Sequence, residues 1–142
     1  MKEGDRITSI NNFLSKYQEF KKVISVIENE ISDIDNELGN IAADFNGVLD
    51  DGDALRVEKL IASKAELSDA WDYYNELIDI IRYILDSIKN SRLRSAARLH
   101  FLDGMTWSSA AEVVGYSAGD VNDIEQEITM LVKKTARDLS SE

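Results

Sequence analysis

The chain of 142 residues contains no proline and no cysteine, and it has only seven glycines and one histidine. The absence of cysteine excludes disulfide bonds, a thiolate nucleophile and a cysteine-ligated metal. The absence of proline favours helices, because proline interrupts helices more strongly than any other residue. Hydrophobic residues make up 44% of the chain, so a net charge of −11 does not indicate disorder. These counts predict a folded, all-α protein.

Long hydrophobic runs are also missing. Met1–Asp5 has no apolar stretch of the kind found in secretion signals. The longest apolar-rich segment, Leu77–Leu85, includes Asp79 and Arg82 and is far shorter than the ~20 residues of a membrane-spanning helix. We therefore expect a cytoplasmic protein that does not enter a membrane.

The first third of the chain carries a heptad pattern. Its apolar residues recur in alternating steps of three and four, which is typical of a coiled coil. The pattern predicts one helix from about Asp5 to Phe45. Its members are Ile10, Phe13, Tyr17, Phe20, Ile24, Ile27, Ile31, Ile34, Leu38, Ile41 and Phe45.

A second heptad pattern follows a turn predicted near residues 46–53, where glycine and aspartate are frequent. Asp53 is placed to cap the next helix. One polar residue, Lys64, interrupts the pattern, and we expect its stem to pack while its ammonium reaches water. Residues 1–90 are thus predicted to form a long antiparallel two-helix coiled-coil hairpin. The second pattern comprises Val57, Leu60, Lys64, Leu67, Trp71, Tyr74, Ile78, Ile81, Leu85 and Ile88.

Further apolar residues widen the apolar face of the second helix beyond what one partner helix covers. They predict a contact with a third element, either the C-terminal module or another subunit, so a homo-oligomer, most simply a dimer, is expected. These residues are Ile61, Tyr73, Leu77, Ile80 and Ile84.

Residues 91–142 are predicted to form a module of three helices. Ser91 would cap the first helix, which would run from Arg92 to Leu102. Thr106 would cap a short helix over Trp107–Val114. Gly115 would end that helix in a left-handed conformation. Ser117 would cap the last helix, with an apolar face of Val121, Ile124, Ile128, Leu131 and Val132.

The segments Arg98–Trp107 and Ala110–Ser117, followed by Val121, carry a resemblance to a known family. They resemble the helix-turn-helix of sigma factor region four, and more closely the phage transcriptional activators related to ArpU and RinA. The resemblance covers about a third of the chain. It implies a phage or prophage DNA-binding transcriptional regulator in the cytoplasm of the host cell. The helix after Ser117 would then enter the major groove of DNA.

Charge is divided unequally along the chain. Residues 1–90 have a net charge of −9, whereas residues 91–142 have a net charge of −2. The basic side chains of the module are candidates for phosphate contacts, and its polar side chains are candidates for base contacts. Alternatively, the arginines pair with acidic residues of the hairpin. The DNA-binding candidates are Arg92, Arg94, Arg98, Ser117, Asn122, Gln126, Lys133, Lys134 and Arg137.

The start of the last predicted helix is acidic where related proteins usually carry Arg or Lys. This departure favours an alternative function, in which the module binds a basic host protein such as a nuclease or RNA polymerase and inhibits or adapts it. The candidate partner-binding residues are Asp120, Asp123, Glu125 and Glu127.

Catalysis is not expected. The chain has no Ser-His-Asp order, no glycine-rich phosphate loop and no His-Glu-x-x-His sequence. His100 lies in a predicted helix, where a packed or surface role is more frequent than a catalytic one. Asp50, Asp51 and Asp53 lack the spacing of a calcium loop, so a turn explains them better. The sequence thus predicts no enzyme, no cofactor and no metal site.

Overall fold

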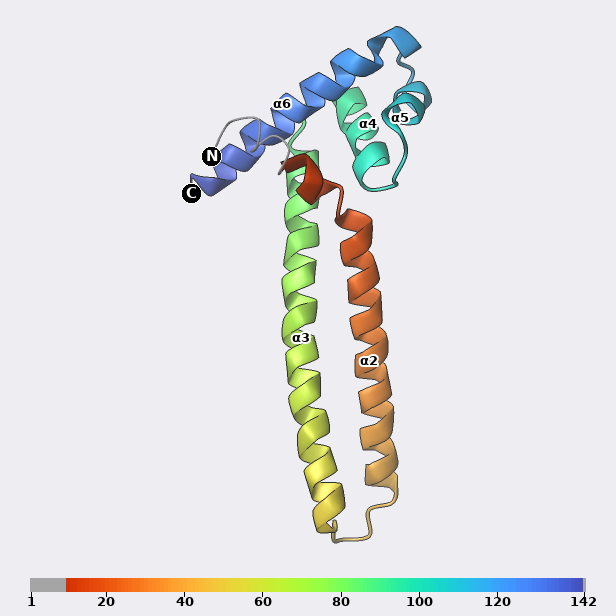
Figure 1. Cartoon of the computed structure of the whole chain (residues 1–142), viewed down its shortest axis with the longest axis vertical. Coiled ribbons are helices and arrows are strands. Elements are labelled where there is room, and N and C mark those ends of the chain that lie inside the picture. The colour runs from red at the N-terminus through yellow and green to blue at the C-terminus, as the bar shows by residue number, and fades with distance from the viewer. Residues whose placement is uncertain (1–9, 142) are drawn as a thin grey trace. The chain divides into compact units, whose positions relative to one another are not determined.

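The computed structural model describes residues 10–141, and every regular element within that range is a helix (Figure 1). None of these helices is long and apolar enough to cross a membrane. After a short helical stretch over residues 10–14, the elements are α2 (Tyr17–Ala43), α3 (Asp51–Asp86), α4 (Ser91–Phe101), α5 (Trp107–Val113), the 3-10 helix η1 (Ala118–Asp120) and α6 (Val121–Ser140).

The chain forms two compact units, which divide within α2 and within α3. Residues 21–77 form the first, called here the two-helix unit. The described residues 10–20 and 78–141 form the second, called the terminal unit. The sequence placed the division at residue 90 instead.

The first heptad pattern does not form one unbroken helix. The predicted start at Asp5 lies outside the described residues, and a turn at Ser15 and Lys16 separates residues 10–14 from α2. The hydroxyl of Ser15 donates to the carbonyl of Asn11 at 2.8 Å, a local bond that competes with regular helix geometry. The turn shifts the buried face, so Leu14 is fully buried although the pattern did not include it.

In the two-helix unit, α2 and α3 run side by side in opposite directions (Figure 1). Ile24 and Ile27 are its buried apolar residues. Lys64 does more than reach water, because its ammonium forms an ion pair with Asp35 on α2 at 2.6 Å. Arg56 and Glu37 form a second ion pair between the two helices. Phe45 and Trp71, both predicted to lie in the contact between the helices, are exposed.

Helix α3 is capped by Asp50 rather than by Asp53. A carboxylate oxygen of Asp50 accepts the backbone N–H of Asp53 at 2.7 Å, so the helix begins at Asp51. Asp50 is the cap because an N-cap side chain accepts the backbone N–H of the residue two or three positions later, which here is Asp53.

The terminal unit encloses the main core. Its fully buried large side chains come from the residue 10–14 helix, from the last turns of α3 and from α6: Leu14, Ile81, Ile84, Leu85, Ile128 and Val132. The predicted third element therefore covers Ile84. Ile61, Tyr73 and Ile80 remain exposed.

Polar contacts join the segments of the terminal unit. A guanidinium nitrogen of Arg82 on α3 donates to the hydroxyl of Tyr17 at 2.6 Å, which raises the pKa of Arg82. Gln18 donates to the carbonyl of Leu102. Helix α4 is capped by Asn90 and not by Ser91, because the amide oxygen of Asn90 accepts the backbone N–H groups of Arg92 and Leu93, each at 3.0 Å.

Candidate nucleic-acid interface

Helix α5 begins and ends as its sequence predicts. The hydroxyl of Thr106 accepts the backbone N–H of Ser109 at 3.1 Å, which confirms the cap. Gly115 has φ of 91°, which confirms the left-handed end. The N–H of Tyr116 then reaches the carbonyl of Ala111 at 2.9 Å, and the N–H of Gly115 reaches that of Glu112 at 3.1 Å. This is a Schellman motif, which fixes the direction in which the chain leaves α5.

The connection to α6 is tighter than predicted. Ser117 makes no side-chain bond to a backbone N–H, so it does not cap the last helix as expected. Its hydroxyl donates to the carboxylate of Asp120 at 2.8 Å. The backbone N–H of Asp120 also bonds to the carbonyl of Ser117 at 3.0 Å, which forms η1 before α6 begins at Val121.

Helix α6 is amphipathic. Ile124, Ile128 and Val132 are buried. Asn122 and Gln126 are exposed and, being four residues apart, share one side of the helix. The predicted acidic residues are also exposed: Asp120 at the end of η1, and Asp123, Glu125 and Glu127 in the first two turns of α6.

Arg92 is the basic side chain that lies beside the connection between α5 and α6. Its guanidinium carbon is 4.9 Å from the ring centroid of Tyr116, in cation–π geometry. Its Nη2 would be 3.8 Å from a Cβ placed on Gly115. Arg92 is itself exposed, so this contact orients a positive charge at the turn that follows α5. Sequence reasoning missed the partner because Tyr116 is 24 residues away.

Arg94 and Arg98 each bond to another part of the chain. A guanidinium nitrogen of Arg94 donates to the carbonyl of Ile88 at 3.0 Å. Arg98 forms an ion pair with Asp86 on α3 at 3.2 Å. The sequence also allowed these arginines to pair with acidic residues of the hairpin. Arg98 does so, because its partner Asp86 lies within residues 1–90.

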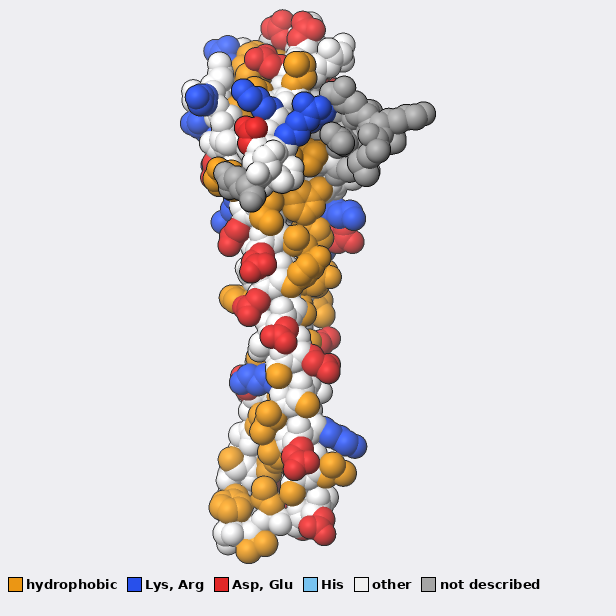
Figure 2. Space-filling model, turned by 90° about the vertical axis from the view of Figure 1, so that its left-hand side faces the viewer, with side chains coloured by type: hydrophobic (Ala, Val, Ile, Leu, Met, Phe, Trp, Pro, Cys, Tyr) orange, Lys and Arg blue, Asp and Glu red, His pale blue; other side chains and the backbone are white. Residues whose placement is uncertain are grey.

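The three basic candidates on α6 differ in accessibility. Lys133 is buried, which removes it from the exposed DNA-binding candidates. Lys134 and Arg137 are exposed. Lys134 lies 12 residues beyond Asn122, or about 18 Å at the rise of a helix. Figure 2 shows Lys and Arg side chains gathered on one face of the terminal unit, with Asp and Glu among them.

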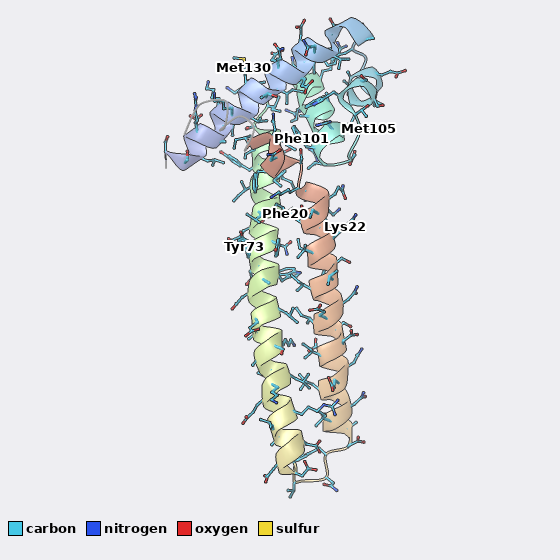
Figure 3. The ribbon with its side chains drawn as sticks, in the orientation of Figure 1. Phe20, Lys22, Tyr73, Phe101, Met105 and Met130 are labelled. Carbon is cyan, nitrogen blue, oxygen red and sulfur yellow. The ribbon has the colours of Figure 1, made fainter. Side chains whose placement is uncertain are left out.

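His100 belongs to an aromatic cluster with Phe101 and Trp107. Its ring stacks on Trp107 with 3.8 Å between centroids. Its Nδ1 is 2.7 Å from the carbonyl of Met105. Figure 3 labels Met105 and Phe101, which lie on the two sides of the turn after α4. Burial lowers the pKa of His100, against the opposing effect of the bond to Met105. Gly104 with φ of 76° turns the chain so that Trp107 returns to His100.

The described residues contain no group of three or more His, Asp or Glu side chains that could hold a metal ion. Comparison with protein-family models, with curated proteins and with solved structures gave no match to this chain.

Proposed function

We propose that this protein is a phage or prophage transcriptional regulator that binds DNA through a helix-turn-helix formed by α5, the connection at Gly115–Asp120 and α6. The observation that carries the proposal is the connection itself. A Thr-capped short helix ends in a Schellman motif and leads, through one 3-10 turn, into a longer helix whose first exposed polar residues face away from the core. In helix-turn-helix proteins, the second helix presents such residues to the major groove.

Each proposed contact follows from the chemistry of the exposed side chains. Asn122 and Gln126 can donate to and accept from the edge of adenine. Arg92 supplies the nearby positive charge that a phosphate contact needs. Lys134 and Arg137 supply two further charges along α6. The two long helices, as a coiled-coil arm, would hold two copies together, so that two half-sites are read at once.

The acidic surroundings set the expected strength of binding. Four of the basic candidates are exposed, namely Arg92, Arg98, Lys134 and Arg137, and Arg98 is paired with Asp86. At most about four phosphates would be neutralised, so affinity would fall with salt with a slope no steeper than about −4. We therefore expect DNA binding that is weak without the correct sequence.

The test is a titration of labelled DNA from the promoter region beside the gene, at about 50 mM salt, where electrostatic binding is strong. Arg92→Gln should weaken binding about tenfold, because it removes the charge at the turn after α5 that would contact a phosphate. Arg98→Gln is the matched control, since it removes the same charge from a residue already paired with Asp86. Failure of the unaltered protein to retain any DNA at this salt concentration would contradict the proposal.

A second function is favoured by the exposed carboxylates on the same turns. Asp123 and Glu127 lie four residues apart on α6 and could meet a basic surface of a host nuclease or RNA polymerase. In that case Asp123→Asn with Glu127→Gln should weaken capture of the purified partner. For a DNA-binding face, the same changes should strengthen DNA binding, because they remove repulsion from phosphates.

A further inference from the structure

The end of the two-helix unit at which α2 passes into α3 exposes large apolar side chains close together. Val48 is 80% exposed and Phe45 is 52% exposed. Figure 2 shows hydrophobic side chains gathered at this end of the unit. We call this surface the apolar tip. It consists of Phe45, Val48, Leu49 and Leu55.

The apolar tip is hollowed. A cavity of about 200 Å³ lies beside Phe45, Val48 and Leu49. Its other lining is mostly polar or charged: Glu37, Asn40, Ile41, Asp44, Asp53 and Arg56. Clustered exposed apolar side chains rimmed by polar residues are typical of interaction sites, whereas single exposed ones need no explanation.

Charge at the tip is of one sign. Residues 44–55 contain four aspartates and no Lys or Arg. The next basic residue, Arg56, also borders the cavity, and it is paired with Glu37. A partner that covers the apolar tip must therefore approach through a negative field.

The negative charge of the apolar tip distinguishes between the partners that could cover it. A second copy of the chain would bring four more aspartates against these four, and like charges opposed across an interface are unfavourable. Nucleic acid and anionic lipid carry the same sign and would be repelled. A protein segment with apolar anchors flanked by Lys or Arg satisfies both the exposed apolar area and the charge.

We propose that the apolar tip is a docking surface for a basic, amphipathic protein segment. The surface is separate in sequence from Arg92 and α6, so the proposal does not rest on DNA binding. If both functions hold, the protein joins its DNA site to a second protein through its arm.

The experiment uses the full chain and a fluorescent synthetic peptide that forms an amphipathic helix of Leu and Lys. Binding should be measurable by anisotropy, and NMR shift changes should concentrate in residues 44–55. Phe45→Ser combined with Val48→Ser should weaken binding about tenfold, because the change removes the two most exposed apolar anchors. Both side chains are largely in water, so the helical circular dichroism should not change.

The matched control is Ile61→Ser, which removes an apolar side chain that is 56% exposed on α3 but does not belong to the tip. It should leave peptide affinity unchanged. A second comparison uses two double variants that each remove two negative charges, one at the tip and one elsewhere on α3. Asp44→Asn with Asp51→Asn should reduce peptide affinity more than Glu58→Gln with Glu66→Gln.

Three results would overturn the proposal. If the tip variants and the control variants lose the same peptide affinity, the basic peptide is attracted to the acidic chain in general and not to the tip. Equal binding of a peptide with Ser in place of Leu would show that the apolar anchors are not used. A dimer in sedimentation that the Phe45→Ser and Val48→Ser changes dissociate would assign the tip to a second copy.

Discussion

The two units of this protein bury their side chains to different degrees. In the terminal unit, Ile81, Leu85 and Ile128 are fully buried, whereas Ile24 and Ile27 of the two-helix unit keep a small exposed fraction and Ile31 and Ile34 a larger one. Two helices can cover only one side of each other, but several helices can enclose a side chain completely. The difference indicates that the terminal unit holds most of the stability per residue, while the two-helix unit offers exposed surface.

The largest effect expected from this comparison concerns two leucines of α3. Leu85→Ala should lower the free energy of unfolding of the terminal unit by about 2–5 kcal/mol, because Leu85 is fully buried and its loss leaves a cavity. Unfolding in urea should be followed by Trp107 fluorescence in a Trp71→Phe background, so that the signal reports on the terminal unit.

Leu67→Ala, made in the same background, is the control. Leu67 lies on the same helix but in the two-helix unit, where it is partly exposed. It should leave the Trp107 transition nearly unchanged. Equal shifts for the two variants would mean that both units unfold as one cooperative body.

A smaller effect, of opposite sign in the two units, is expected at two glycines. Gly115→Ala should destabilise the terminal unit by about 1–2 kcal/mol, because φ at this position is 91° and an L side chain is strained there. The shift of the Trp107 transition measures it.

Gly39→Ala should instead stabilise α2 by about 0.5–1 kcal/mol, since alanine forms helix better than glycine and a Cβ at this position meets no atom within 4 Å. Thermal melting followed by circular dichroism measures this change.

If Gly115→Ala instead left the stability of the terminal unit unchanged, the turn before α6 would tolerate another backbone geometry.

The smallest effect is expected from pH. Burial lowers the pKa of His100 below its ordinary value of 6.5, so below about 6.5 the unfolded chain binds the proton more readily than the folded chain. The free energy of unfolding of the terminal unit should therefore decrease as pH falls from 6.5 towards the lower pKa of the folded state.

His100→Gln should remove this part of the pH dependence and leave the dependence due to carboxylates at lower pH. Denaturation at a series of pH values, with Trp107 fluorescence as the signal, tests the prediction. An unchanged slope in the variant would assign the dependence to other groups.

Local signals in the sequence predicted the C-terminal helices closely. Thr106 and Gly115 act within a few residues of their own position, so the cap and the left-handed turn follow from residue type alone. The caps of α3 and α4 were misplaced by one to three residues, because aspartate, asparagine and serine cap equally well and stand near one another in both places. The backbone conformation at each position determines which of these neighbouring residues caps the helix.

The candidate site was less predictable. Arg94 and Arg98 were candidates for phosphate contacts, but in the fold Arg94 donates to the carbonyl of Ile88 and Arg98 pairs with Asp86. Folding also buried Lys133 and brought Arg92 to Tyr116. The first two pairings cross the end of a helix and the third spans 24 residues, and the periodicity of a single helix contains no information about any of them.

By itself, the sequence of this protein determined an all-helical chain, because the absence of proline and the recurring apolar residues act over one or two helical turns. It also determined the net negative charge of residues 1–90 and the acidic residues between positions 120 and 127. The tertiary structure alone decided the burial of Leu14 and Lys133 and the contact between Arg92 and Tyr116. These depend on the packing of segments far apart in the chain, which no local pattern encodes.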